Sequence, residues 1–352
     1  MGCGQSAPQI ALGTNSQGQP FSSLYALSTE IGQGAFGTVY AAAPKHAARG
    51  ARFCVKVQRV NVPGKDDSTV AQEARLHNLQ AALERAVSRG DDTAVGMVKR
   101  QLSKQRTVIS KTTRMTEAEQ VHAEVAMLRR CKHDRVQEVV DVFESVEHVA
   151  VVLVKYSMGL RQAGDFGMLL EGARAAKVLR QTAEGLAYLH EEKIVHCDIK
   201  PDNLMITDSG DTIICDFGLA QELAPGATSV ENITGTPGYC SPEMHLFNSQ
   251  GPQSDVWALG CVAGWLLGVQ ISHMDIGAIC CDEGDTTGSE PATPSGGPWD
   301  ARVRAAVGEA LDALPLAPQE WAGGVALAKR MLEPCEKQRI TAAGVVADPW
   351  CQ

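Results

Sequence analysis

Apolar residues recur with two different periods along the chain, and the period distinguishes strands from helices. Around residues 31–40, at residues 53–57 and again at residues 149–154, short runs of apolar and other strand-forming residues predict β-strands. From Val121 onward apolar residues follow at helical spacing, after the capping-box sequence of residues 116–119. A second helical period over residues 173–189 leads into a short strand at Ile194-Val195.

A long insertion separates the strand Phe53–Val57 from the helix that begins near residue 117. Within about residues 62–114, two apolar sets with helical spacing flank the polar residues 88–92, which predicts two amphipathic helices joined by a turn. The sets are Leu76, Leu79, Leu83 and Ala86, and Val95, Val98, Leu102 and Ile109. The insertion is either a regulatory or docking hairpin or a decorative, partly disordered one. A second stretch, about 282–298, is low in complexity and is expected to be a surface loop.

Composition narrows the class of protein. Hydrophobic residues make up 44% and charged residues 21%, which is ordinary for a globular chain, and no apolar run is long enough to span a membrane. A net charge of −9 argues against nucleic acid as a partner and weakly favours basic ones. The eleven cysteines are scattered without metal-ligand spacing, so we expect a reducing, cytoplasmic setting.

The first six residues, Met1-Gly2-Cys3-Gly4-Gln5-Ser6, match the pattern for N-myristoylation of Gly2. One myristoyl chain binds membranes only marginally, and no Lys or Arg precedes Lys45, so palmitoylation of Cys3 is the available second signal. Residues 7–22 are rich in Gln, Ser, Gly and Pro. We therefore expect residues 1–24 to be a flexible, lipidated tether on the cytosolic face of a membrane.

The candidate chemistry lies near the centre, in residues 196–203 and in Asp216-Phe217-Gly218. Phosphoryl transfer needs a base, a cation and metal ligands. The segment resembles the catalytic loop and D-F-G sequence of the eukaryotic protein kinase superfamily, Ser/Thr type. Within that superfamily, residues 235–243 look most like the calcium/calmodulin-dependent kinase group. The resemblance implies ATP and Mg²⁺, with Asp198 as base, Lys200 as phosphate cation, and Asn203 and Asp216 as metal ligands.

The first strands resemble the nucleotide-binding part of the same family. Residues 31–40 read G-x-G-x-F-G-x-V, and the run continues as a strand, which disfavours a Rossmann loop. The resemblance implies nucleotide contacts from Ile31, Gly32, Gly34, Gly37, Val39, Cys54 and Lys56 and, in the hinge after the strand 149–154, from Val154, Lys155 and Ser157. Leu153 is the alternative to Val154. Lys56, which could instead be an ordinary exposed lysine, would pair with Glu124, with Glu119 as the rival.

Residues 235–243 resemble the end of a kinase activation segment. The resemblance implies that Thr236 bonds Asp198 and Lys200, that Glu243 pairs with a buried Arg339, and that the helix start at Asp255 braces the catalytic loop. Asp202 and Asp165 stand where acidic residues favour arginine-containing substrates in related kinases. One departure is Cys197, where the family has an arginine that receives a loop phosphate. We therefore expect activity that depends little on loop phosphorylation, or that depends on the insertion or a partner.

Taken together, the chain is expected to have an α+β, bilobal protein-kinase fold, with a lobe at 25–157 and a helical lobe at 158–352. The expected function is a membrane-anchored Ser/Thr protein kinase. The alternatives are a pseudokinase scaffold and, less favoured, a small-molecule phosphotransferase.

Overall fold

The computed structural model describes residues 10–34, 37–46, 53–60, 117–165, 172–231, 235–281, 298–313 and 321–352. Packing divides the chain into two compact units. The small unit comprises Met1–Met127 and Val139–Lys155, and the large unit comprises Leu128–Glu138 and Tyr156–Gln352. The expected hairpin at about 62–114 lies outside the described residues, as do Gly2, Cys3 and the low-complexity stretch up to residue 297.

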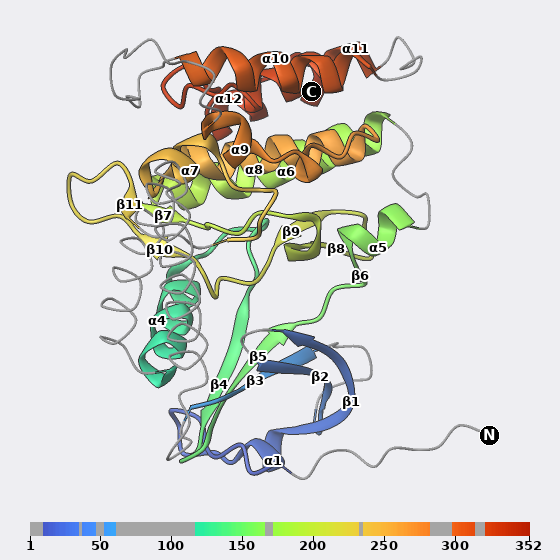
Figure 1. Cartoon of the computed structure of the whole chain (residues 1–352). Helices are drawn as coiled ribbons and strands as arrows, with labels where there is room; N and C mark the ends of the chain where they lie inside the picture. Colours follow the sequence, from blue (N-terminus) through green and yellow to red (C-terminus); the bar gives the residue numbers. More distant parts are fainter. Residues whose placement is uncertain are drawn as a thin grey trace, which may run out of the picture. The chain divides into compact units, whose positions relative to one another are not determined.

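The small unit is built on a five-stranded antiparallel sheet with the strand order β1-β2-β3-β5-β4 (Figure 1). The strands are β1 (Tyr25–Gly34), β2 (Gly37–Pro44), β3 (Phe53–Arg59), β4 (Val139–Glu144) and β5 (His148–Val154). Successive side chains of a strand point to opposite faces. In β5, Ala150 and Val152 therefore join one apolar cluster and Val149 and Val151 join another.

The helix α4 (Glu117–Arg130) covers one of these faces. Its buried Val121 and Val125 pack with Val142, Val149 and Val151 of β4 and β5. These α4 residues are the ones that the helical period identified. The period therefore predicted both the helix and the side on which it is buried.

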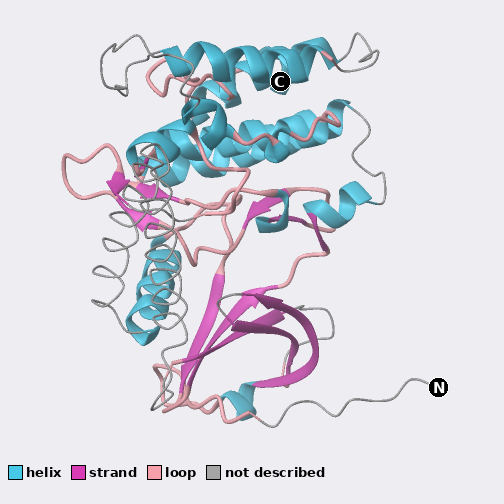
Figure 2. Cartoon of the chain, viewed as in Figure 1, coloured by secondary structure: helices cyan, strands magenta, loops and turns pink. Residues whose placement is uncertain are grey.

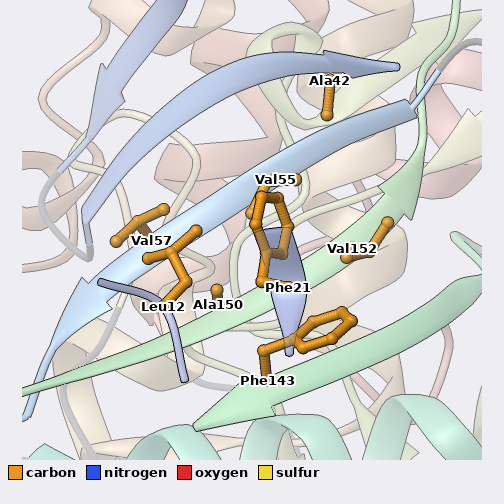
Figure 3. Close-up of a cluster of buried hydrophobic side chains, with 8 residues drawn as sticks. All are labelled: Leu12, Phe21, Ala42, Val55, Val57, Phe143, Ala150 and Val152. Carbon is orange, nitrogen blue, oxygen red and sulfur yellow. The ribbon is translucent and has the colours of Figure 1, made fainter. Parts of the chain in front are cut away.

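The opposite face of the sheet is covered by the N-terminal segment, residues 10–24, which ends in the short helix α1 (Phe21–Leu24). Leu12 and Phe21 are buried against Val55, Val57 and Phe143 (Figure 3). Thr14 and Glu144 exchange two backbone hydrogen bonds of 3.1 and 3.0 Å at the edge of β4. The expectation of a flexible tether up to residue 24 is therefore wrong for residues 10–24, because apolar burial and backbone pairing fix this segment to the sheet.

The large unit is mostly helical (Figure 2). Its helices are α5 (Leu160–Asp165), α6 (Gly172–Glu191), α7 (Pro242–Phe247), α8 (Pro252–Leu266), α9 (Ile276–Cys281), α10 (Pro298–Asp312), α11 (Ala322–Met331) and α12 (Ala342–Val346). Its strands are β6 (Met158–Gly159), β7 (Ile194–Val195), β8 (Leu204–Ile206), β9 (Thr212–Ile214), β10 (Gln221–Glu222), β11 (Val230–Glu231) and β12 (Ser249–Gln250), with 3₁₀ turns η1 (Pro201–Asn203), η2 (Ile271–His273) and η4 (Pro349–Cys351). α8 is buried nearly all round and packs on α6 and α11, so it is the central helix of this unit. Among the described residues, no helix combines the length and apolar character needed to cross a membrane.

Residues 128–138 belong to the large unit, although the sequence assigned them to the first lobe. The His133 ring stacks on that of Tyr188 in α6 at 4.9 Å. Ile214 of β9 donates its backbone N–H to Arg135 O at 2.8 Å and accepts one from Gln137 at 2.9 Å. These contacts with α6 and β9 correct the predicted boundary. The predicted α+β class with two parts, one built on a sheet and one mostly helical, is confirmed.

Substitution of Gly13 tests whether the N-terminal segment is part of the small unit. Gly13 and Gly18 both have positive φ, +76° and +73°, but a Cβ at Gly13 would lie 1.6 Å from Glu144 O, whereas at Gly18 it would meet nothing within 4 Å. We expect Gly18→Ala to lower the free energy of unfolding by about 1 kcal/mol, from backbone strain alone. Gly13→Ala should cost roughly 3 kcal/mol or more, because the segment must leave the edge of β4. Urea unfolding of both variants measures the difference, and equal losses would show that the segment does not contribute to folding.

Candidate active site

The loop between β7 and η1 is held by one buried carboxylate. Asp255, in the first turn of α8, accepts hydrogen bonds of 2.9 Å from the backbone N–H groups of His196 and Cys197, and a third of 2.9 Å involves His190 Nε2. Cys197 has a positive φ of 65°, a conformation that costs energy for a residue other than glycine. Asp255 therefore stabilises a strained backbone turn just before Asp198.

The Asp198 carboxylate is the centre of a polar cluster. Its Oδ2 accepts from Lys200 Nζ at 2.8 Å and from Asn203 Nδ2 at 2.9 Å, and its Oδ1 accepts from the Thr236 hydroxyl at 2.7 Å. Lys200 Nζ also donates to Thr236 Oγ1 at 2.6 Å. Asp198 is 7% exposed. A carboxylate oxygen can accept two hydrogen bonds, and these contacts use only one position on Oδ1. The arrangement can therefore accept a hydroxyl proton beside a fixed cation.

Asn203 and Asp216 offer oxygen atoms suited to magnesium. The Asn203 amide nitrogen donates to both the carbonyl and the carboxylate of Asp198, which leaves its carbonyl oxygen as the acceptor. Cys215 N donates to Asn203 O at 2.9 Å, which brings the exposed Asp216 next to Asn203 along the backbone. Mg²⁺ prefers oxygen ligands and is commonly held by one or two protein side chains together with phosphate and water. The two residues fit this ion.

The buried Phe217, directly after Asp216, packs its ring edge-on against His196 at 4.9 Å. His196 Nε2 lies 3.1 Å from Cys215 O, and its Nδ1 accepts from Asp198 N at 3.3 Å. A carbonyl can only accept, so the proton of this imidazole is assigned to Nε2. His196 thereby links the segment before Asp216 to the backbone of Asp198.

In the small unit, Lys56 and Glu124 form an ion pair. Lys56 Nζ lies 2.8 Å from Glu124 Oε1, and the two side chains are only 12% and 10% exposed. Lys56 projects from β3 to the face that carries α4, because Val55 and Val57 on either side of it are buried on the other face. Glu124 is the partner that the sequence favoured. Glu119, the rival, is exposed near the start of α4.

The glycine-rich segment forms the β1–β2 hairpin. Gly34 is paired with Gly37 and Gly32 with Val39, and Ile31 is exposed, while residues 35 and 36 lie outside the described residues. At Gly37, φ is +133° and a Cβ would lie 2.4 Å from Val57 O. Glycine is therefore required there both by conformation and by the close approach of β3.

The strand β3 places Cys54 opposite Leu153, and Phe53 opposite Val154 at the end of β5. Burial raises the pKa of the Cys54 thiol to about 11, so Cys54 is a neutral, small side chain at neutral pH. Lys155 is the last residue of this part of the small unit. Ser157 belongs to the large unit, where its hydroxyl bonds Asp208 and its N–H donates to Ile206 O at 3.0 Å.

Residues 219–231, part of the expected activation segment, are held to the rest of the large unit by short ladders and apolar contacts. β10 pairs with β7, and β11 pairs with β12. The buried Cys197 packs with Val195 and Leu223, and Leu219 and Val230 lie against this cluster. In the family that the sequence resembles, an arginine receives a phosphate at this position. Here a small apolar contact takes its place.

Glu243 and Arg339 form a fully buried pair. Arg339 donates to both Glu243 oxygens, at 2.8 and 3.0 Å, and Ser254 donates to Oε1 at 2.8 Å. Further donations reach the carbonyls of Glu333, Gln253 and Pro334, and the guanidinium lies 5.1 Å from the Trp257 ring centroid. Burial raises the pKa of Glu243, but the Arg339 charge outweighs it, so the pKa lies below its usual value. The pair joins α7 to α8 and to the segment between α11 and α12.

The two carboxylates expected to favour basic substrates differ in their surroundings. Asp165 is exposed. Both oxygens of Asp202 are bound by Arg161, from Nε at 2.7 Å and from Nη2 at 2.8 Å. No sequence pattern indicated this contact, because the two residues share neither a helix face nor a strand pair.

The chain belongs to the protein kinase family: the protein kinase domain matches residues 82–351. The first three strands and Lys56 precede the matched range, and the structure places them in one sheet with β4 and β5. The expected resemblance to the Ser/Thr-type kinases is confirmed by the relatives.

Among them, serine/threonine-protein kinase fused of Drosophila melanogaster is 32% identical over 177 residues, 50% of this chain and 21% of that protein. Death-associated protein kinase 2 of Homo sapiens is 34% identical over 156 residues, 42% of this chain and 41% of that protein. Serine/threonine-protein kinase PLK4 of Aedes aegypti is 36% identical over 147 residues, 41% of this chain and 19% of that protein. The matched part thus spans less than half of each of these relatives.

Removal of the buried guanidinium should destabilise the large unit much more than removal of an exposed one. Arg339→Ala leaves Glu243 charged and buried, which should lower the free energy of unfolding by about 3–5 kcal/mol. Arg304 makes a similar two-point contact with Glu333 but is 47% exposed, so Arg304→Ala should cost under about 1 kcal/mol. Urea unfolding at neutral pH compares the two variants. Equal losses in the free energy of unfolding would contradict the stabilising role of the buried Glu243–Arg339 pair.

The same pair predicts a pH dependence. The pKa of Glu243 is lowered in the folded chain, so its stabilising contribution is present above its unfolded value of about 4.5. This contribution is lost as the pH falls through the folded value. The stability gap between the wild type and Arg339→Ala should therefore narrow in acid.

Proposed function

We propose that the chain is an active Ser/Thr protein kinase, which transfers the γ-phosphate of ATP to a protein hydroxyl. The observation that carries this proposal is the Asp198 cluster. A carboxylate with one acceptor position left on Oδ1 lies beside Lys200 and Thr236, and its orientation is fixed by Asn203. The lysine two residues after the base and the threonine in the activation segment are features of Ser/Thr-type kinases. Two of the relatives described above are also named serine/threonine-protein kinases.

Each residue then has a definite task. Asp198 accepts the proton of the acceptor hydroxyl as that oxygen bonds to the transferred phosphorus and the bond to the ADP oxygen breaks. Lys200 stabilises the negative charge of the transferred group, and Lys56, fixed by Glu124, holds phosphate oxygens. Asn203 and Asp216 would hold magnesium, which neutralises phosphate charge when bound. Ile31, the loop glycines, Val39, Cys54, Val154, Lys155 and Ser157 are proposed to line the nucleotide.

The substitutions Asp198→Asn and Asp216→Asn test the proposal. The wild type should transfer labelled phosphate from Mg-ATP to generic protein substrates, and each variant should be slower by roughly 10²–10⁴-fold, since the base or a metal ligand is lost. Asp312→Asn, which removes the same charge from an exposed ion pair with Lys329, is the matched control and should keep wild-type activity. Thermal unfolding with and without Mg-ATP supplies a separate measure of nucleotide binding.

The outcomes separate the candidate functions. Transfer that is lost in both Asn variants establishes the enzyme. A magnesium-dependent nucleotide shift without transfer, even with added cell extract as a source of activators, would favour the pseudokinase scaffold. The absence of both phosphate transfer and a nucleotide-dependent thermal shift would overturn the proposal.

Phosphatase treatment should leave the activity unchanged, because Cys197 and its apolar neighbours hold the activation segment without a phosphate.

We also propose that the chain is anchored to the cytosolic face of a membrane by acylation of Gly2 and Cys3. The support is the sequence pattern of residues 1–6, together with the packing of the chain from about residue 10 onward. Ile10 lies against the cluster that covers the sheet, so an acylated Gly2 would keep the small unit within about 30 Å of the membrane.

Fractionation of cells expressing Gly2→Ala, Cys3→Ser and the wild type tests the anchor. The wild type should sediment with membranes, Gly2→Ala should be released, and Cys3→Ser should be bound only weakly, since one myristoyl chain anchors marginally. Ser6→Ala is a useful intermediate, because it weakens the acylation pattern and leaves both acylated residues in place. Membrane binding of Gly2→Ala equal to that of the wild type would refute the proposal.

A further inference from the structure

A cluster of three side chains lies close to the proposed base. The guanidinium of Arg161, from α5, makes two parallel hydrogen bonds to the Asp202 carboxylate in η1, with distances of 2.7 and 2.8 Å. Arg161 Nη2 also reaches the Tyr239 hydroxyl at 3.5 Å. The Arg161 and Asp202 side chains are 42% and 45% exposed, so a partner molecule can approach them.

The guanidinium is also held from the side of α8. It lies 5.8 Å from the centroid of the Trp265 ring, within the range of a cation–π contact. A Cβ at residue 164 would be 2.3 Å from Trp265 Cη2, so this ring fits only because the residue is Gly164. Arg161 is therefore positioned by an aromatic ring as well as by Asp202. The position of the Arg161 guanidinium is therefore more closely defined than that of an arginine in an ordinary surface ion pair.

Two short stretches of backbone connect the cluster to Asp198. Asp202 is adjacent to Asn203, whose amide bonds the Asp198 carboxylate at 2.9 Å. Tyr239 N donates to Thr236 O at 3.1 Å, and the Thr236 hydroxyl bonds Asp198 at 2.7 Å. A peptide extends by up to about 3.5 Å per residue. A substrate whose hydroxyl reaches Asp198 therefore carries residues a few positions away within range of this cluster.

We propose that Arg161 is a specificity-determining residue, which occupies from within the chain the carboxylate that a substrate arginine or lysine would otherwise bind. The inference rests on the proposed kinase function. A basic substrate residue must displace a two-point hydrogen-bonded guanidinium and is repelled by its charge, whereas a neutral residue meets neither obstacle. The chain thus selects against basic residues near the acceptor, contrary to the preference expected from Asp202 alone.

The geometry of Asp202 supports this consequence. Arg161 binds both oxygens of the carboxylate. Removal of the arginine therefore frees both oxygens next to the peptide path. Arg161→Ala should therefore create a binding site for a basic residue.

Kinetics on matched peptides test the proposal. One peptide set carries a single arginine at successive positions on either side of one serine, and the reference peptide carries alanine throughout. The measured quantity is the kcat/KM ratio of each arginine peptide to the reference. In the wild type no position should raise this ratio appreciably above one. In Arg161→Ala and in Arg161→Gln the ratio should rise by roughly 2- to 5-fold at one or two positions, the upper part of the range for an exposed charge pair.

Two controls make the result specific. Arg161→Ala combined with Asp202→Ala should return the ratio to the wild-type value, because the carboxylate is absent. Arg304→Ala removes a comparably exposed arginine of α10 from its ion pair with Glu333, and it should leave the ratio unchanged. Wild-type selection for arginine, or an unchanged ratio in both Arg161 variants that unfold like the wild type, would overturn the inference.

Peptide binding separates failure of this inference from failure of the proposed function. If the wild type transfers no phosphate to any peptide, fluorescence anisotropy of the labelled arginine and alanine peptides still tests the role of Arg161. Tighter binding of an arginine peptide to Arg161→Ala than to the wild type, abolished in the double variant, would support the inference on its own. Equal binding to all three would refute it.

Discussion

The turn that precedes Asp198 depends on one buried carboxylate, that of Asp255. Removing a charge from water is costly, and the cost is offset here by two backbone N–H groups and His190. The two N–H groups belong to His196 and Cys197, so the carboxylate fixes the backbone of the turn in which Cys197 has its strained, positive φ. That turn sets the direction of Asp198, and the contacts of Lys200, Asn203 and Thr236 with Asp198 all require it. The Asp198 cluster is therefore stabilised from within α8.

The same region packs against part of the expected activation segment through apolar contacts. A phosphate-binding arginine would be long and charged, and would leave an unpaired charge beside an apolar strand whenever the phosphate was absent. Cys197 is small and buried among Val195 and Leu223, and its contacts form whenever the segment folds. The Glu243–Arg339 pair holds the far end of the segment in the same permanent way. The contacts of the described parts of this segment, residues 219–231 and 235–243, are thus part of the fold.

Local motifs predicted much of the site, because phosphoryl transfer needs fixed residue types at fixed spacings. Lys56 and Glu124 could be paired across a long insertion, since each lies in a motif of its own. The packing of residues 10–24 could not be predicted. Leu12 and Phe21 stand in a stretch rich in polar residues, glycine and proline with no period, and their partner Phe143 is distant in sequence. Residues 128–138 were misassigned for a similar reason: their contacts with α6 and β9 are tertiary.

Asp202 shows most clearly what could not be predicted from the sequence, because the availability of a carboxylate for binding a substrate depends on its neighbours in space. The net charge of −9 favours an encounter with basic molecules, but at physiological ionic strength charges act over only about 8 Å. Overall charge therefore influences how a substrate approaches, while the groups within hydrogen-bonding distance determine which side chain binds. At Asp202 that group is Arg161, which lies beside the Trp265 ring of α8, and that ring packs against Gly164 in the same helix as Arg161. A preference inferred from the carboxylate alone and one inferred from the pair have opposite signs, and the local geometry determines which holds.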